Sequence, residues 1–269
     1  MKKNIKMAIL VAFLGAFVAC SSESTPTYSE LGSDNYPQKF YVEYVPCTYG
    51  ANWSPEAFNQ DMLPGWQELL VEVDSTIVAA YGLTYEGEKP EDAPGDGFWQ
   101  LIWNSKADAD AGWETWESYE KTADWSESTA DILACGTKAE TFSFDAYVRR
   151  DGNALGAFNL ESFSSDYQQC LYNEGQGSSE LIAVIDQFEE WIESSDSSIY
   201  APYSYVVLAP DYEDEEVDLF WGNFNQNAEL RDAGNAYFLK TGTDIQDAFD
   251  KVMTCEDPID YVTGEIPLT

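Results

Sequence analysis

Two stretches of the chain can be laid on each other without a gap: FWQLIWNSKADADAGW at residues 98–113 and FWGNFNQNAELRDAGN at residues 220–235. Phe-Trp falls on Phe-Trp and Asp-Ala-Gly on Asp-Ala-Gly, at an offset of 122 residues. Self-similarity at a fixed offset is typical of an internal repeat. The sequence therefore predicts two copies of one structural unit.

Four cysteines follow nearly the same spacing. Cys47 and Cys170 lie 123 residues apart, and Cys135 and Cys255 lie 120 residues apart. An even number of cysteines in an exported chain indicates disulfides, and four thiols allow three connectivities. Because each half carries one pair, the repeat favours the bridges Cys47–Cys135 and Cys170–Cys255 over the connectivities that cross between the halves.

Both halves show the same order of predicted elements: strand, helix, strand, strand, helix, strand. Helix starts are marked by Ser54 before Pro55, by Ser105 and by Asn227. The predicted strands lie at 39–49, 75–84, 98–103 and 142–148 in the first half and at 158–172, 200–209, 217–224 and near 261 in the second. This order is the ferredoxin-like β-α-β-β-α-β unit, so the predicted fold class is α+β.

The cysteines agree with this topology. In a ferredoxin-like unit the last strand runs antiparallel beside the first, so the end of the first strand lies near the start of the last. Cys47 and Cys170 end first strands, while Cys135 and Cys255 shortly precede last strands. The topology thus supplies the Cα separation of roughly 4.4–6.8 Å that a disulfide needs.

Two such units in one chain resemble the dimeric α/β-barrel superfamily, in which two ferredoxin-like sheets pack face to face. The resemblance covers residues 39–269 and implies that the tandem units pack as one barrel within the chain. The superfamily includes small antibiotic-biosynthesis-type monooxygenases and heme-handling proteins. The chain departs from it in having no histidine, so no catalytic residue is carried over.

The first twenty residues, MKKNIKMAILVAFLGAFVAC, have the plan of an export signal. Three lysines accompany an apolar run at 7–16, and Phe-Val-Ala-Cys at 17–20 forms a cleavage box. This box resembles the lipobox of bacterial lipoproteins, with Phe17 where leucine is usual. The resemblance implies a lipid on Cys20 and, because Ser21 follows, sorting to the outer membrane of a Gram-negative cell.

The sequence therefore predicts four segments. They are a signal peptide at 1–19, a lipidated polar tether at 20–37, a first ferredoxin-like unit at 38–152 and a second at 153–269. The apolar run of the signal is shorter than the roughly 20 apolar residues of a membrane-spanning helix.

Composition excludes several classes of function. The chain carries 49 acidic and 13 basic residues, a formal net charge of −36, and no histidine. This charge excludes nucleic-acid binding through a basic groove. The lack of histidine excludes Ser-His and Cys-His nucleophiles, His-based zinc sites and a proximal heme histidine. We therefore expect no cofactor and no metal site.

Aromatic residues at matching places of the two halves are candidates for a ligand pocket. Phe98-Trp99 and Phe220-Trp221 are expected to line equivalent pockets between sheet and helices, where the indole faces of Trp99 and Trp221 suit stacking on flat ligands. Tyr44 and Tyr167 begin the Tyr-x-x-Cys-x-Tyr pattern of each half. The alternative is that all four fill the core, as aromatics on central strands usually do.

Acidic residues form a second group of candidates. Asp110 and Asp232 each precede Ala-Gly in a predicted helix, and the hairpin turns at 86–96 and 211–218 are acidic in both halves. Carboxylate clusters can hold calcium, but neither turn has the spacing of a known calcium loop, and Asp-Gly-Asn at 151–153 is only a fragment of one. Solvated charge is the simpler interpretation.

These features lead us to expect a non-enzymatic, lipid-anchored protein of the cell envelope, monomeric when mature, that binds a small ligand or a protein partner. One alternative is a histidine-free enzyme of the monooxygenase-like barrel type, acting on a flat or phenolic substrate. Another is a carbohydrate-binding lipoprotein with Trp and Tyr platforms. No catalytic motif in the sequence selects among them.

The predicted attachment can be tested at Cys20. Cys20→Ser removes the thiol that would carry the lipid, so the protein should leave the membrane fraction or persist as an uncleaved precursor. Cell fractionation and mass spectrometry of the N-terminal peptide measure both outcomes. A diacylglyceryl group on the variant would contradict the lipoprotein prediction.

Overall fold

The computed structural model describes residues 38–150, 155–214 and 216–269. The predicted signal peptide and tether, with Cys20, and the predicted boundary between the units at 152/153 lie outside these ranges. Within them, no helix combines the length and the apolar character needed to cross a membrane.

Each half contains the predicted order of elements. The first half runs β1 (Gln38–Tyr49), α1 (Pro55–Ala57), a π-helical turn (Phe58–Met62), α2 (Leu63–Glu72), β2 (Ile77–Tyr85), β3 (Gly97–Trp103), α3 (Lys106–Ser118), α4 (Glu120–Thr129), β4 (Leu133–Cys135) and β5 (Phe142–Val148). The second half runs β6 (Phe163–Tyr172), α5 (Ser178–Ser194), β7 (Tyr203–Pro210), β8 (Leu219–Asn225), α6 (Ala228–Thr241), α7 (Thr243–Val252), β9 (Met253–Cys255) and β10 (Ile259–Glu265). The three-residue strands β4 and β9 were not predicted.

The predicted helix caps are confirmed. Ser54 Oγ accepts a hydrogen bond from the backbone N–H three residues later at 3.0 Å, and Ser105 Oγ does the same at 3.2 Å. Asn227 Oδ1 accepts from the third residue after it at 2.9 Å. Each cap satisfies one backbone donor that the first turn of a helix leaves unpaired.

The predicted start of the second unit's first strand, at residue 158, is wrong. β6 begins at Phe163, and the described part of the preceding segment, 155–162, is not a strand. Gln226, directly after β8, holds this segment instead. Its Oε1 accepts from Asn159 N at 2.7 Å and its Nε2 donates to Ser162 O at 2.9 Å. Side-chain hydrogen bonds thus replace the ladder that a longer strand would form.

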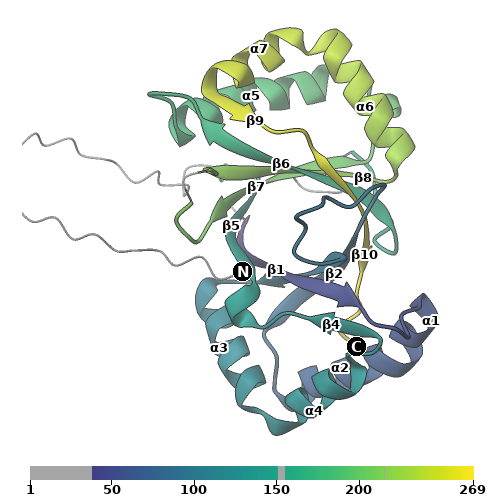
Figure 1. The fold of residues 1–269 in the computed structure, drawn as a ribbon. Helices are drawn as coiled ribbons and strands as arrows, with labels where there is room; N and C mark the ends of the chain where they lie inside the picture. The colour runs from purple at the N-terminus through teal and green to yellow at the C-terminus, as the bar shows by residue number, and fades with distance from the viewer. Residues whose placement is uncertain (1–37, 151–154, 215) are drawn as a thin grey trace, which may run out of the picture.

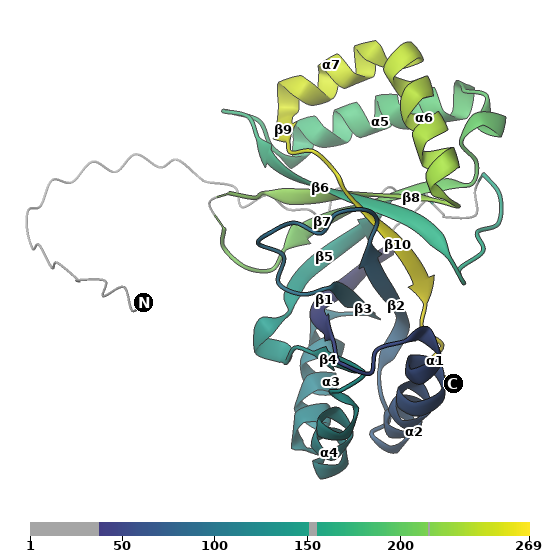
Figure 2. The same cartoon turned by 45° about the vertical axis from the view of Figure 1, so that its right-hand side comes forward.

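Eight strands form one closed antiparallel barrel, in the order β10-β2-β3-β1-β5-β7-β8-β6 and back to β10. Within each half the last strand lies beside the first. The halves join at two seams, where β5 pairs with β7 and β10 pairs with β2. Figures 1 and 2 show the barrel between two helical layers, α1–α4 on one side and α5–α7 on the other. The predicted α+β fold, two ferredoxin-like units packed as an intrachain barrel, is confirmed.

Alternation of side chains gives each strand a lumen face and a helix face. The lumen holds one aromatic core cluster shared by both halves, which includes Tyr44, Phe144 and Tyr167. Each helical layer covers a further hydrophobic core. Each of these two cores also contains a residue from the other half of the chain. Tyr147 of β5 packs in the core beneath α5–α7, and Ile266, just after β10, packs in the core beneath α2–α4.

Two disulfides lie at equivalent places in the halves. Cys47 of β1 is bonded to Cys135 of β4, and Cys170 of β6 to Cys255 of β9, which is the pairing that the repeat predicts. The bonded residues are 88 and 85 positions apart in sequence. By chain entropy, closing a loop of this length stabilises a fold by up to about 4 kcal/mol.

The repeat extends to acidic residues of the hairpins. Asp96 Oδ2 accepts from Tyr49 N at 2.9 Å, and Asp218 Oδ2 accepts from Tyr172 N at 2.7 Å. Each aspartate therefore holds the last residue of the first strand of its unit. These two acids have a structural role, which the interpretation of the hairpin acids as solvated charge had missed.

Ion pairs of a matching kind cross between the halves. Asp211, directly after β7, is paired with Lys106 of α3 and accepts a hydrogen bond from the Tyr41 hydroxyl at 2.8 Å. Glu86, directly after β2, lies 2.9 Å from the Arg231 guanidinium of α6. The acidic hairpin of each half is thus bound by a cation from a helix of the other half.

This architecture predicts that the first half cannot stand alone. A chain limited to residues 38–150 would expose the edges of β2 and β5 and one face of its sheet. It should therefore precipitate or dimerise, whereas residues 38–269 should be monomeric and unfold in one step. Light scattering and calorimetry measure this. A soluble, monomeric first half with its own transition would mean that the seams are dispensable.

Candidate functional site

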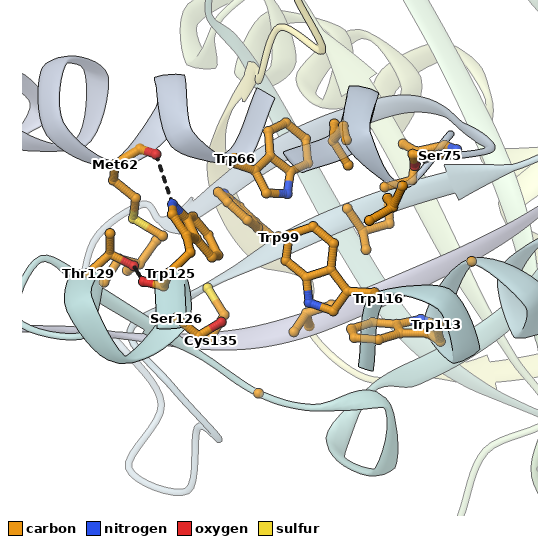
Figure 3. A pocket seen from close by; sticks show the side chains of 18 of the residues that line it. Met62, Trp66, Ser75, Trp99, Trp113, Trp116, Trp125, Ser126, Thr129 and Cys135 are labelled. Carbon is orange, nitrogen blue, oxygen red and sulfur yellow. Dashed lines mark hydrogen bonds between the residues drawn. The ribbon is translucent and has the colours of Figure 1, made fainter. Parts of the chain in front are cut away.

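A cavity of about 380 Å³ lies in the first half, between the helix face of the barrel and helices α2–α4. Small-molecule sites typically measure roughly 300–1,000 Å³. Figure 3 shows aromatic side chains converging on this space from both the strands and the helices. Six tryptophans line it: Trp66, Trp99, Trp103, Trp113, Trp116 and Trp125. We call it the tryptophan cavity.

Strand and helix periodicity place these indoles. Trp99 and Trp103 are separated by an even number of positions on β3, so both lie on its helix face. Trp113 and Trp116 are three positions apart on α3 and share one side of that helix. Gly112 lets α3 approach the sheet, because a Cβ there would lie 2.5 Å from the ring of Trp103. The Asp-Ala-Gly motif of the first half thus contributes a close helix–sheet contact.

Three of the six indole N–H groups have acceptors within the protein. Trp103 Nε1 donates to Glu43 Oε2 at 3.0 Å, and Trp113 Nε1 donates to the same oxygen at 2.6 Å. Trp125 Nε1 donates to the backbone oxygen of Met62 at 3.2 Å, a bond drawn in Figure 3. These bonds fix three of the rings that line the cavity.

The other three indoles, Trp66, Trp99 and Trp116, donate to no acceptor among the described residues. Their indole nitrogens are not among the described side-chain atoms that are both buried and without a hydrogen-bond partner. Each of these nitrogens therefore has some accessible surface. Trp66 and Trp99 are nevertheless 3% and 7% exposed, with ring centroids 5.0 Å apart. Three tryptophans of the cavity wall therefore carry N–H groups that no described residue binds.

Glu43 is a buried carboxylate that the sequence analysis missed. It lies on the helix face of β1 and is 0% exposed. Its Oε1 is paired with Lys138, and its Oε2 receives the N–H groups of Trp103 and Trp113. A buried charge costs several kcal/mol unless it is paired and hydrogen-bonded, and here it is both. Glu43 therefore positions two walls of the cavity.

The internal repeat could have pointed to Glu43 from the sequence alone. The offset of 123 that aligns Cys47 with Cys170 also aligns Glu43 with Asp166, and Asp166 is 3% exposed on β6. Its hydrogen-bond partner is a neutral amide, because Asn223 Nδ2 donates to Asp166 Oδ1 at 2.8 Å. Burial raises the pKa of the Asp166 carboxyl to about 6.

The four aromatic candidates do not share one pocket. Trp99 lines the tryptophan cavity. Trp221 lies in the core of the second half, stacked on Tyr205 at 4.7 Å. Tyr44 and Tyr167 point into the lumen, with ring centroids 5.6 Å apart. The phenylalanine before each tryptophan also faces the lumen, because adjacent residues of a strand point to opposite faces.

The second half fills the space that is hollow in the first. Phe188 of α5 is the centre of an aromatic cluster beneath α5–α7, where its ring lies 5.5 Å from Tyr205, 6.0 Å from Trp221 and 5.9 Å from Phe249. The pseudo-symmetry of the backbone therefore does not extend to equivalent pockets.

The acidic candidates do not form a metal site. Asp110 is 53% exposed and lies 3.6 Å from Lys138, while Asp232 is 69% exposed and lies 3.1 Å from Arg231. In the described part of the chain, no group of three or more cysteine, aspartate or glutamate side chains is arranged to hold a metal ion. The Asp-Gly-Asn stretch at 151–153 lies outside the described residues.

The sequence matches no protein-family model and no curated protein. Solved structures match at low identity. A presumed monooxygenase from Fusobacterium nucleatum is 9% identical with a TM-score of 0.47, covering 85% of this chain and 93% of its own. A mutant chlorite dismutase from Candidatus Nitrospira defluvii is 8% identical with a TM-score of 0.48, covering 85% and 92%. A heme-binding protein from Thermus thermophilus is 11% identical with a TM-score of 0.46, covering 85% and 92%.

These comparisons correct the expectation of a non-enzymatic binding protein. The three structures named above each cover 85% of this chain. They are described as a presumed monooxygenase, a chlorite dismutase and a heme-binding protein. The non-enzymatic interpretation is therefore not carried further.

The described residues do not fit heme. The chain has no histidine, and the four described cysteines are bonded in disulfides, so they offer iron neither imidazole nor thiolate. No tyrosine is among the described residues that line the tryptophan cavity, and Met62 is its one thioether. Methionine ligates heme iron in cytochromes together with histidine. Heme therefore has no part in the function proposed below.

Asp166 should make stability depend on pH. An unfolded chain releases this proton near pH ~4, whereas the folded protein holds it to pH about 6. The raised pKa therefore stabilises the folded state, and this contribution is complete below about pH 4. It is lost as the pH rises through about 6. Asp166→Asn keeps a side-chain oxygen that accepts the hydrogen bond from Asn223, but its amide does not titrate. Its gain in unfolding free energy should be small at pH 4 and reach about 2–3 kcal/mol at pH 8.

Urea unfolding at both pH values measures this gain. Asp232→Asn, at an exposed position, is the matched control and should show no comparable pH dependence. An equal gain for Asp166→Asn at pH 4 and pH 8 would show that the buried carboxyl does not hold its proton.

Proposed function

We propose that this chain is a histidine-free enzyme that oxidises a flat, phenolic small molecule in the tryptophan cavity. The observation that carries the proposal is the set of free indole N–H groups of Trp66, Trp99 and Trp116 around one apolar space of about 380 Å³. Apolar aromatic walls favour a planar ligand, because rings stack on or meet edge to face with indoles. A few placed polar groups then fix its orientation.

The hydrogen-bonding chemistry of the walls narrows the substrate. An indole N–H donates and cannot accept. A ligand that satisfies these groups must therefore bring an acceptor oxygen, such as a phenolate or a quinone carbonyl. An aromatic hydrocarbon without oxygen would leave the donors unpaired, at a cost of ~1–3 kcal/mol for each buried group.

Glu127 of α4 is the candidate proton acceptor. It is the one charged side chain among the described residues that line the cavity, and it is exposed, which places it toward the mouth. Removal of the phenolic proton by this carboxylate would make the ring electron-rich enough to react with dioxygen. One oxygen atom would enter the ring, and the other would leave as water. Glu43 is a positioning residue in this scheme, because both of its oxygens are already bound.

The carbohydrate alternative has less support. Sugar platforms present open aromatic faces to solvent, whereas Trp66 and Trp99 are 3% and 7% exposed. The lipid anchor remains part of the proposal. It rests on the cleavage box at 17–20 and would hold the enzyme at the outer membrane, with Cys20 outside the described residues.

The proposal predicts the behaviour of two conservative variants. Trp66→Phe and Trp99→Phe keep an aromatic ring but remove the N–H, so each should weaken binding of 1,4-naphthoquinone about fivefold to tenfold, the free energy of one hydrogen bond. Trp221→Phe, the same change in the filled core of the second half, is the control and should leave affinity unchanged. Isothermal titration calorimetry measures the three affinities.

Activity is measured separately, with 1-naphthol as substrate. An oxygen electrode and the absorbance of 1,4-naphthoquinone should show equal consumption of oxygen and formation of quinone. Glu127→Gln should lower kcat by about 10²-fold or more, the usual contribution of a general base. Naphthoquinone binding without oxygen consumption by the wild type would leave a binding site but reject the enzyme.

A further inference from the structure

The lumen of the barrel is filled at one end and hollow at the other. At the filled end, aromatic rings meet mostly edge to face: the centroid of Tyr44 lies 5.6 Å from Phe144 and 5.6 Å from Tyr167, and Tyr85 lies 4.9 Å from Tyr261. At the other end a cavity of about 220 Å³ remains. We call it the lumen cavity, and it is separated from the tryptophan cavity by the sheet.

Both halves build the lumen cavity. Its lining includes Phe40, Ile102 and Ala146 from the first half and Phe163, Val206 and Phe224 from the second. Small side chains account for the hollow. Ala146 and Ser204 are 1% and 5% exposed, and their neighbours on the same faces of β5 and β7 are the larger Phe144 and Val206.

The described residues of the lining carry no charge, although the chain as a whole has a net charge of −36. The two buried polar residues of the wall are already bound: Gln100 Nε2 donates to the Tyr44 hydroxyl at 2.9 Å, and Ser204 Oγ donates to the backbone oxygen of Arg150 at 3.1 Å. Gln100 is 7% exposed, and its Oε1 accepts no hydrogen bond from a described residue. One buried acceptor therefore remains in an otherwise apolar wall.

The mouth of the lumen cavity is formed by Phe158 and Leu160. Leu160 is 39% exposed, so the cavity reaches the surface beside it. Gln226 binds this segment at the backbone of Asn159 and Ser162. The mouth is thus a held loop rather than a strand, which explains why the predicted strand from residue 158 does not form.

We propose that the lumen cavity is a second binding site, which takes one neutral, single-ring molecule with at most one hydroxyl group. An apolar cavity of about 150 Å³ in another protein stays dry and binds benzene, so 220 Å³ accommodates a ring with one or two substituents. A charged ligand would lose its hydration without gaining a counter-ion. A single hydroxyl would donate to Gln100 Oε1.

The test uses p-cresol, toluene and p-toluate, which share one ring and differ by a hydroxyl and a charge. Calorimetry on the full protein should show p-cresol binding at least as tightly as toluene, and p-toluate at least a hundredfold more weakly. Ala146→Leu fills the cavity and should weaken binding of p-cresol tenfold or more. Because p-cresol is also a phenol of the class proposed for the tryptophan cavity, the lumen event is the one that Ala146→Leu removes, and Trp99→Phe should retain that event.

Crystals soaked with 4-bromotoluene locate the ligand independently of the proposed enzyme activity. An anomalous bromine peak beside Gln100 in the wild type, absent in Ala146→Leu, is expected. Ser204→Val provides a smaller filling change if Ala146→Leu does not fold. A wild-type lumen without bromine, a peak that both filling variants retain, or p-toluate binding as tightly as toluene would each overturn the proposal.

Discussion

Closure of the barrel is the constraint on which the rest of this structure depends. Each ferredoxin-like unit has two edge strands, β2 and β5 in the first half and β7 and β10 in the second. All four edge strands are paired at the seams, β5 with β7 and β10 with β2. Closure removes the unpaired backbone groups that make an open sheet prone to aggregate. It also encloses the lumen and brings each acidic hairpin to a cation of the other half.

Duplication has preserved the backbone scheme while the side chains diverged. The disulfides, the side-chain cap of the helix after each hairpin (Ser105 and Asn227) and the aspartate that binds the end of each first strand recur in both halves. The aligned carboxylates do not behave alike, because Glu43 is paired with Lys138 and Asp166 with an amide. Phe188 fills one helix–sheet space, and the other is hollow and lined with tryptophans. The tryptophan cavity is therefore a property of one half.

The two cavities lie on opposite faces of the same strands. Trp99 and Gln100 are adjacent on β3, yet the first lines the tryptophan cavity and the second the lumen cavity. β3, which carries both residues, is paired with a strand on each side. Acidic side chains are almost excluded from both linings, with Glu127 as the exception. Charged side chains are thus nearly absent from the described cavity walls, although the interior also holds the buried carboxylates Glu43 and Asp166 outside these linings.

The sequence by itself determined the repeat, the order of elements, the helix caps and the cysteine pairing, because these depend on local periodicity and on fixed offsets along the chain. Only the tertiary structure decided which helix–sheet space stays open, and that Lys138, 95 positions away, neutralises Glu43. These outcomes depend on side chains from distant segments that pack or pair at one place in the fold. No local pattern along the chain predicts those contacts.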